Sequence, residues 1–386
     1  MKKQNTVIVA LACLVAVTAA TWLALVAPMY TGNEINMRRG VSSLANTHYD
    51  LHMVILYICV VIGILVFTAM FTSIVLHRKS KGHEAAQFSH STKAEIAWTI
   101  IPVLILIVMA VPATKALVEM ESPVGAEMTV KITGFQWKWK YEYMEEDIAF
   151  VSTLSADSNQ ARQLGSGIDP RDVDNYLLDV DKPLVLPVGK KIKFLITADD
   201  VIHAWWVPDF GWKRDAIPGF INEAWVQIDK PGVYRGQCAE LCGKDHGFMP
   251  IVVIAKEQDE YAAWVESQSV ANLAATEEQS REWEFAELMD RGENVYDKQC
   301  ATCHQADGKG LGEAFPALAG SEVATGPVEE HIRVVLEGRA GTAMQAYAEV
   351  LTPSDIAAAL TYTRNAFGND TGEAVQPADI TGFNKG

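Results

Sequence analysis

The sequence predicts a multidomain membrane protein that consists of a two-helix transmembrane hairpin, a small all-β domain and an all-α domain. Three observations lead to this fold class. Long apolar stretches occur only near the N-terminus, alternating aromatic residues follow them, and helical segments surround a Cys-x-x-Cys-His motif near the C-terminus. One hydrophobic core rarely serves more than about 250–300 residues, so a chain of 386 residues is expected to form several domains.

The average composition conceals parts that differ strongly from one another. The mean hydropathy is only +0.07, although the first third of the chain is very apolar. The chain has 32 basic and 48 acidic residues, and residues 256–386 contain 9 of the basic and 23 of the acidic ones. Because phosphate binding needs a basic face, this net charge of −16 excludes nucleic acid as the main partner.

The first apolar stretch, residues 7–26, follows two lysines and is rich in small residues. This pattern is typical of a secretory signal peptide, but about 20 apolar residues can also span a bilayer as a retained helix. We therefore interpret residues 1–27 as a signal peptide or an extra helix, and we favour cleavage.

Residues 28–122 are predicted to form the transmembrane hairpin, with helices at about 51–76 and 94–118. Both segments are long enough to cross the lipid. The loop between them carries Arg78, Lys79, Lys81 and Lys93 against Glu84, so the positive-inside rule places it in the cytoplasm. The chain after the hairpin then lies outside the cytoplasm, which in a bacterial protein is the periplasmic side of the inner membrane.

Glu95 stands at the cytoplasmic end of the third apolar stretch. Its position alone favours a solvated acid at the start of a helix, where a negative charge stabilises the macrodipole. The alternative is a carboxylate at the mouth of a proton pathway.

Residues 123–256 are predicted to form a β-sandwich or β-barrel. In residues 135–143 aromatic and polar side chains alternate, as in a strand with one buried face. Further strands are predicted at residues 176–180, 191–197, 223–228 and 249–254, separated by turn residues. Residues 155–174 break this rhythm with Ser, Asp, Gly and Asn, and we interpret them as a surface insertion.

The last two predicted strands bracket a set of sulfur and nitrogen donors. Cys238, Cys242, His246 and Met249 lie within 12 residues, and His203 precedes them. Two thiols, two imidazoles and a thioether suit copper, and two cysteines can bridge two copper ions. A Cys238–Cys242 disulfide and a Cys2His2 zinc site are the alternatives. The tight Cys-x-x-x-Cys-x-x-x-His spacing and the methionine favour copper.

This part of the chain, about residues 51–255, resembles subunit II of cytochrome c oxidase. The resemblance rests on the hairpin, on Gln-Trp-Lys-Trp at 136–139, on His-Ala-Trp-Trp-Val-Pro at 203–208, on Asp-Ala-Ile-Pro-Gly at 215–219 and on the loop at 238–249. It implies a cupredoxin-like Greek-key barrel and a dinuclear copper centre, CuA. The implied ligands are His203, Cys238, the backbone carbonyl of Glu240, Cys242, His246 and Met249.

The resemblance also implies roles outside the copper shell. The Glu240 carboxylate would face a magnesium ion shared with subunit I, and Glu95 matches the acid at the mouth of a proton pathway. Trp137 matches the aromatic residue that receives electrons from cytochrome c, although a core aromatic would fit the strand pattern equally well. Phe135 and Phe220 depart from the family, which often has His and Arg there, and neither position is a metal ligand.

The segment after the β domain is helical and acidic. Residues 257–283 are predicted to form a semi-rigid linker, because residues 257–278 contain no Pro or Gly. Residues 284–368 are predicted to form the all-α domain, and residues 369–386 a C-terminal tail. The final helix of the all-α domain is predicted to begin with Thr352 as N-cap and Pro353 at the first helical position, and to end at about Phe367.

Within this domain, Cys300, Cys303 and His304 form the Cys-x-x-Cys-His pattern of covalent haem c attachment. A redox dithiol is the alternative, but it would not need the adjacent histidine. Downstream, Met344 and His331 are the only candidates for the sixth iron ligand. We favour Met344, which raises the reduction potential, and we interpret His331 as a solvated helix residue.

Residues 284–368 resemble small class I cytochromes c, an all-α fold. Pro316 matches the family's proline beside the haem, whereas Gln345 departs from a frequent proline after the ligand methionine. The whole chain thus resembles the fused subunit II of caa-type bacterial oxidases.

This resemblance implies that electrons pass from an external donor, such as a basic soluble cytochrome c, through haem c, Trp137 and CuA to subunit I. Oxygen reduction and proton pumping would occur in subunit I, with subunit III and membrane lipid as further partners. The alternatives are a copper-containing nitric oxide reductase subunit, a quinol oxidase subunit II that lacks copper, and an electron-transfer module without a fixed oxidase.

Overall fold

The computed structural model describes residues 36–383 except 83, 85, 86, 164, 313, 314, 340 and 349, and it describes only the backbone of 271–276. The predicted signal peptide or extra helix, residues 1–27, lies outside the described residues. The chain divides into two compact units. The first contains the helical hairpin with segments 208–212 and 225–229, and the second contains most of the β domain and all of the C-terminal helices.

The hairpin consists of helix α2 (Ser43–Leu76), the short 3-10 helix η2 (Lys79–Lys81) and helix α3 (Thr92–Met120). Helix α2 begins eight residues earlier than the apolar stretch predicts, because the Ser42 side chain caps it by accepting a hydrogen bond from the Ala45 amide. Both helices are long and apolar enough to span a membrane. Pro102 and Pro112 lie inside α3.

Segments 208–212 and 225–229 are hydrogen-bonded to the ends of the hairpin helices. Ser42 Oγ donates to the Phe210 carbonyl at 2.8 Å, and Trp225 Nε1 donates to the Glu119 carbonyl at 3.0 Å. Ser42 is completely buried. These bonds satisfy polar groups at the helix ends that would otherwise lack partners.

The β domain contains two five-stranded sheets, ordered β3-β2-β1-β5-β8 and β4-β10-β9-β6-β7. The strands are β1 (Met128–Phe135), β2 (Lys138–Tyr143), β3 (Ile148–Ser152), β4 (Leu184–Pro187), β5 (Lys191–Ala198), β6 (His203–Val207), β7 (Trp212–Ala216), β8 (Asn222–Gln227), β9 (Gly232–Cys238) and β10 (Pro250–Lys256). Strand β1 pairs with β2 antiparallel and with β5 parallel, so the sheet is mixed. This arrangement is the predicted cupredoxin-like class of fold.

Two of the predicted strands are wrong. The aromatic segment 135–143 is a hairpin rather than one strand: Phe135 pairs with Lys138, and Gln136 and Trp137 form the turn between β1 and β2. Residues 176–180 form turns, with only an isolated bridge from Val180 to Leu154. In both places the pattern of aromatic and apolar residues suggested a strand, but periodicity does not show where the chain turns.

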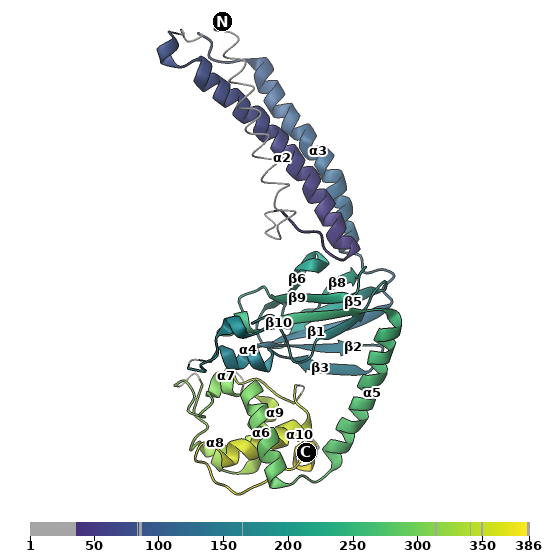
Figure 1. The fold of residues 1–386 in the computed structure, drawn as a ribbon, viewed down its shortest axis with the longest axis vertical. Helices are drawn as coiled ribbons and strands as arrows, with labels where there is room; N and C mark the ends of the chain where they lie inside the picture. Colours follow the sequence, from purple (N-terminus) through teal and green to yellow (C-terminus); the bar gives the residue numbers. More distant parts are fainter. Residues whose placement is uncertain are drawn as a thin grey trace. The chain divides into compact units, whose positions relative to one another are not determined.

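The insertion at 155–174 carries a short helix, α4 (Ala156–Ala161), and a 3-10 helix, η3 (Pro170–Asp172). After the β domain, α5 (Gln258–Ser280) leads to the C-terminal helices (Figure 1). These are α6 (Phe285–Gln299), α7 (Ala301–His304), α8 (Glu322–Thr325), α9 (Val328–Glu337), α10 (Pro353–Asn365) and α11 (Pro377–Phe383). We call residues 285–383 the haem module and residues 128–256 the copper domain, for reasons given below.

Helices α6 and α10 cross at Gly292. A Cβ atom at this position would lie 2.2 Å from the Ala358 carbonyl oxygen, so only glycine allows the two backbones to approach this closely. Thr352 caps α10 as predicted, accepting from the Asp355 amide, but the helix ends at Asn365 rather than at Phe367. The predicted tail is not a loose segment, because it contains α11 and Ile380 belongs to the hydrophobic core.

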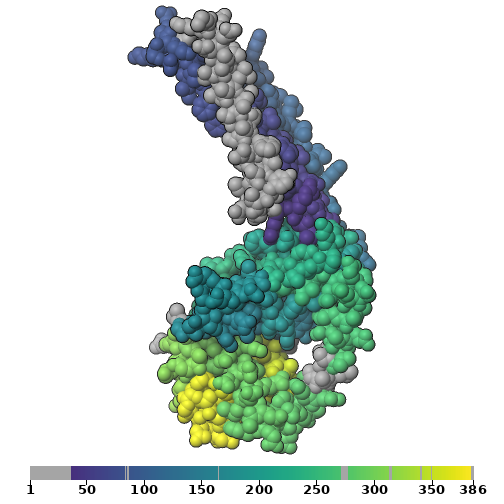
Figure 2. All heavy atoms as spheres, viewed as in Figure 1, coloured from purple at the N-terminus to yellow at the C-terminus, as the bar shows by residue number. Residues whose placement is uncertain are grey.

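Most of the copper domain belongs to the same compact unit as the haem module. In Figure 2 the green and yellow atoms of the haem module lie directly against the teal atoms of the copper domain. The linker helix α5 therefore joins two modules that are also in direct contact.

Candidate metal and haem sites

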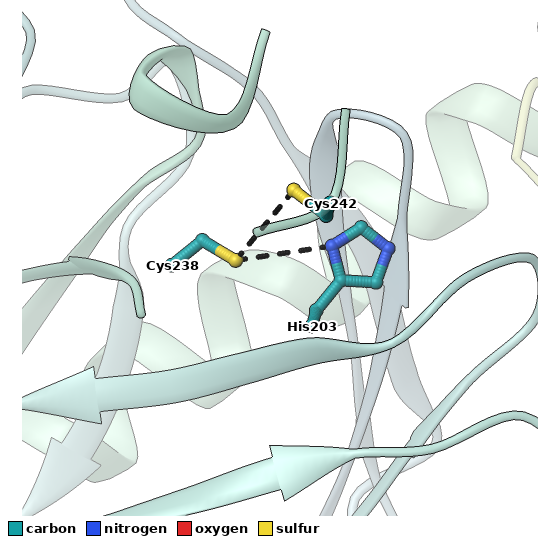
Figure 3. A group of neighbouring side chains, drawn as sticks. All are labelled: His203, Cys238 and Cys242. Carbon is teal, nitrogen blue, oxygen red and sulfur yellow. Dashed lines mark hydrogen bonds between the residues drawn. The ribbon is translucent and has the colours of Figure 1, made fainter. Parts of the chain in front are cut away.

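The six predicted copper ligands come together at one end of the β domain. His203 begins β6 and Cys238 ends β9, while Cys242, His246 and Met249 lie on the loop at 238–249 that leads into β10. His203 is completely buried, and the two cysteines and Met249 are almost so. Figure 3 shows the His203 ring and both cysteine sulfurs pointing toward one another.

The donor atoms are spaced like ligands that share metal ions. Sγ of Cys238 lies 3.8 Å from Sγ of Cys242, 3.9 Å from Nδ1 of His203 and 3.4 Å from the Glu240 carbonyl oxygen. Two ligands about 2.0–2.3 Å from one ion at a tetrahedral angle lie roughly 3.5 Å apart.

The Cys242 side of the site is equally compact. Its Sγ lies 3.4 Å from Nδ1 of His246 and 3.5 Å from Sδ of Met249. The other four predicted donors therefore surround the pair of cysteine sulfurs.

The His203 ring is oriented by a carboxylate that the sequence analysis did not single out. Nε2 of His203 donates to Oδ1 of Asp200 at 2.9 Å. Because a carboxylate can only accept, the proton is on Nε2 and the Nδ1 lone pair faces the sulfurs. Carboxylates commonly fix metal-binding histidines in this way. The only sequence signal was an acid three residues before the histidine.

The two thiols have opposite acidities. The hydrogen bond from Cys242 lowers the pKa of Cys238 to about 3. The same contact, together with burial, raises the pKa of Cys242. The pair therefore loses its first proton easily, and a cation must displace the second.

The donor set fits copper better than the alternatives. A disulfide requires sulfurs about 2.05 Å apart, whereas these two cysteines are free and 3.8 Å apart. Two thiolates, two imidazoles, a thioether and a carbonyl exceed the four ligands of a structural zinc site. Their softness and number suit a pair of copper ions bridged by sulfur.

Trp137 lies against the loop at 238–249, which we call the copper loop. Its Nε1–H donates to the Cys242 carbonyl at 3.2 Å, and Nε2 of Gln136 donates to the same oxygen at 2.8 Å. Gly243 has φ +118°, and a Cβ there would meet the Gln136 amide at 2.9 Å and the indole at 3.2 Å. The hairpin turn thus places a half-buried aromatic ring directly on a ligand-bearing peptide.

The haem-attachment motif is arranged to present an iron ligand. Nδ1 of His304 donates to the Pro316 carbonyl at 2.8 Å, which leaves the Nε2 lone pair for iron. Cys300 is the N-cap residue of α7 and Cys303 lies within this helix, both as free thiols. These residues fit covalent attachment of a haem, and the place of Pro316 beside that haem stays a prediction.

His331 is not the solvated residue that we expected. The residue is only 4% exposed, and within the part of the chain that the structure describes its Nδ1 has no hydrogen-bond partner. Burial lowers its pKa to about 4, and the nearby positive charges of Arg364 and His304 act in the same direction. Met344 lies in the loop after α9, and its backbone carbonyl accepts a hydrogen bond from the Arg339 amide at 2.8 Å. Which of the two binds iron stays a prediction.

A small cavity separates Trp137 from the haem-attachment motif. Its volume is about 60 Å³, and its lining is mainly polar. Trp137, Lys138 and Arg162 line it from the copper domain, and Cys303 and Gln345 line it from the haem module. Trp137 and the haem-attachment motif therefore face each other within one unit of the protein.

Two carboxylates with predicted roles lie outside the set of copper donors. Glu95 is exposed in the first turn of α3. Glu240 is exposed, with its carbonyl near Cys238.

The fold and the donor sets define a membrane-anchored protein with a cupredoxin-like copper domain and a c-type haem domain. Residues 128–256 match the periplasmic domain of cytochrome c oxidase subunit II, and residues 30–116 match its transmembrane domain. Residues 287–362 match subunit III of cbb3-type cytochrome c oxidase.

The chain also resembles named relatives. It is 38% identical over 249 residues to a probable cytochrome c oxidase subunit 2 of Rickettsia bellii, which covers 64% of this chain and 88% of that protein. It is 30% identical over 335 residues to cytochrome c oxidase subunit 2 of Alkalihalophilus pseudofirmus, which covers 82% and 86%. The crystal structure of the periplasmic domain of subunit II from Bradyrhizobium japonicum is 44% identical, covers 38% of this chain and 96% of that chain, and gives a TM-score of 0.33.

The chain belongs to the cytochrome c oxidase subunit 2 family, here with a C-terminal cytochrome c domain. It is a subunit of a haem–copper oxidase in the bacterial inner membrane, with both outer domains on the periplasmic side. Its family and donor sets imply CuA copper and haem c.

Proposed function

We propose that this chain is the electron-accepting subunit of a cytochrome c oxidase, in which electrons arrive at the haem module and leave through the copper loop toward subunit I. The observation that carries this proposal is the direct contact between the two modules. Cys303 of the haem-attachment motif and Trp137 line the same cavity, and Trp137 is hydrogen-bonded to the ligand-bearing residue Cys242.

The roles of the chain's own residues follow from this geometry. His304 and Met344 would hold the haem iron. Trp137 would shorten the gap between the modules with a polarisable ring. Copper and haem supply reversible one-electron chemistry when bound, and the protein contributes distance, orientation and exclusion of water.

Three further roles extend beyond this chain. The Glu240 carboxylate would help bind a magnesium ion shared with subunit I; its support is that the side chain is exposed while the carbonyl is turned to Cys238. Glu95 would stand at the mouth of a proton pathway, supported by its exposed position in the first turn of α3. Oxygen would be reduced to water, with proton translocation, in subunit I, and subunit III would complete the core complex.

The acidic haem module favours a basic soluble cytochrome c as the external donor, because complementary charge steers association. Covalent fusion raises the local concentration of the haem module, so the soluble donor need not reach the copper loop itself. The oxidation rate of such a donor should therefore fall as ionic strength rises. A rate that does not change with salt would contradict this part of the proposal.

The decisive experiment is to purify the complex from membranes and to measure copper, haem types and oxygen uptake together. The proposal predicts haem c, copper and oxygen consumption in one complex. Haem c and copper with nitric oxide reduction but no oxygen uptake would favour the alternative, a CuA-containing nitric oxide reductase.

The route within the chain can be tested with Cys242→Ser. Loss of this bridging thiolate should block oxidation of haem c by subunit I, while the haem c spectrum stays unchanged. Oxidation of haem c at the wild-type rate would show that the copper loop is not on the path.

A further inference from the structure

The insertion at 155–174 is not only a surface feature, because its helix α4 contacts the haem module. Arg162 at the end of α4 makes three hydrogen bonds: Nε to Asn159 Oδ1 at 2.8 Å, NH1 to Asp245 Oδ2 at 3.0 Å and NH2 to Thr302 Oγ1 at 3.0 Å. Asn159 also donates to the Asp297 carbonyl at 3.4 Å. One side chain thus connects three separate segments.

Two of these partners lie next to residues that are predicted to hold the copper and the haem. Asp245 directly precedes His246, a predicted copper ligand, and Thr302 directly precedes Cys303, a predicted haem-attachment residue. The Arg162 guanidinium therefore bridges the copper loop and the haem-attachment motif through two hydrogen bonds.

The bridge is shielded from solvent. The side chain of Arg162 is 12% exposed and that of Asp245 is 5% exposed. The guanidinium also lies 4.4 Å from the centre of the Phe248 ring, on the same copper loop. Its planar donor fork binds two groups at fixed angles, which a lysine ammonium cannot do.

Neighbouring contacts hold the same segment of the haem module. Lys138 Nζ donates to Gln299 Oε1 at 3.0 Å, and Lys244 Nζ donates to the Thr302 carbonyl at 2.8 Å. Cationic side chains of the copper domain thus surround residues 299–302 of the acidic haem module.

We propose that Arg162 is a positioning residue that holds the haem-attachment motif in register with the copper loop, and thereby sets the rate of electron transfer between the two modules. This inference rests on the proposed electron route. It assigns the insertion a role: α4 supplies the arginine that joins both redox loops.

The variants must distinguish loss of the bridge made by Arg162 from a general disturbance of the copper loop. Removing Arg162 leaves Asp245 buried without its partner, which can disturb the loop. Thr302→Val removes only the bond to the haem module and leaves the Arg162–Asp245 pair in place. Arg162→Lys keeps the charge but loses the fork. Arg171→Gln is the matched control, because Arg171 lies in the same insertion with an 87% exposed side chain paired to Asp169.

The experiment uses the complete oxidase complex with all centres loaded. Haem c is reduced rapidly, and its reoxidation by the copper centre is followed by absorption. Hydrogen exchange of the amides at 299–304 reports how firmly the motif is held, and absorption and electron paramagnetic resonance spectra report whether each centre is intact.

We expect Arg162→Gln and Thr302→Val to slow the transfer several-fold and to speed amide exchange at 299–304, with unchanged spectra of both centres. Arg162→Lys should restore the rate only in part, and Arg171→Gln should behave like the wild type. Wild-type rates in both Arg162→Gln and Thr302→Val would overturn the inference. A slower rate only in Arg162→Gln, together with an altered copper spectrum, would also overturn it, because Arg162 would then act on the copper loop alone.

The Cys242→Ser variant distinguishes failure of this inference from failure of the proposed route. If Cys242→Ser blocks haem c oxidation while Thr302→Val has no effect, the route stands and the positioning role is wrong. If Cys242→Ser leaves haem c oxidation intact, the route itself is wrong, and the inference falls with it.

Discussion

The indole Nε1–H of Trp137 is hydrogen-bonded to the backbone carbonyl of Cys242 at 3.2 Å, which connects the β1–β2 turn to the copper loop. Trp137 also lines the cavity that faces Cys303. The same ring therefore touches the copper loop on one side and faces the haem-attachment motif on the other.

Replacing Trp137 should slow electron transfer into the copper loop. Trp137→Phe keeps a ring but loses the bond to Cys242, which contributes about 1 kcal/mol to the loop, and Trp137→Ala loses both. We expect the rate of haem c reoxidation to fall in the order wild type, Phe, Ala. Trp264→Phe, in the linker helix, is the control and should change nothing. Equal rates in all four proteins would contradict the role of Trp137.

Asp200→Asn should weaken copper binding without removing a ligand. The carboxylate fixes the Nε2–H tautomer of His203, and loss of such a partner commonly costs about 10- to 100-fold in metal affinity. Copper retained after dialysis against a chelator measures the effect. Asp199→Asn changes the exposed neighbouring acid and should retain copper like the wild type. Full retention in Asp200→Asn would show that the protein does not need this carboxylate.

Lys138 should make the stability of the protein depend on alkaline pH. Burial lowers its pKa from 10.5 to about 8, so burying its charge costs roughly 3 kcal/mol at most. The cost is fully present below about pH 8 and disappears as the pH rises toward 10.5, because lysine in the unfolded chain is then also neutral.

Lys138→Met should therefore be more stable relative to wild type below pH 8 than near pH 10.5, as measured by thermal unfolding midpoints. Lys309→Met, which removes an exposed lysine of the haem module, is the control. A constant difference between Lys138→Met and wild type over this range would contradict the prediction.

The axial ligand of the haem can be identified by two substitutions. Met344→Ala should remove the methionine–iron charge-transfer band and lower the reduction potential, because methionine ligation raises it. His331→Ala should leave both properties unchanged. The opposite pattern would make His331, which is buried and neutral, the ligand.

Gly292→Ala should destabilise the haem module. The added Cβ would meet the Ala358 carbonyl at 2.2 Å, and such overpacking typically costs about 1–3 kcal/mol. Among the described residues beyond its own helix, none lies within 4 Å of a Cβ at Gly382 in α11, so Gly382→Ala should be neutral or slightly stabilising. Thermal unfolding of the two variants provides the comparison; equal midpoints would show that α6 and α10 can move apart without cost.

Much of the architecture could be predicted because local chemistry determines it. Membrane helices are marked by long apolar runs, and haem attachment by the spacing of Cys300, Cys303 and His304. The hairpin at Gln136–Trp137 was missed, since the aromatic alternation continues through the turn. His331 was misjudged because burial of one position on an amphipathic helix depends on neighbours that are distant in the sequence.

The sequence by itself determined which chemical groups the protein contains: two thiols, two imidazoles and a thioether for copper, and a covalent haem motif. Only the tertiary structure decided how these groups are supported. Asp200 orients His203, Trp137 contacts Cys242, and Arg162 of a polar insertion bridges Asp245 and Thr302. Ligand types are encoded in short motifs, whereas these contacts join segments up to 140 residues apart, and no local pattern records which distant segments pack together.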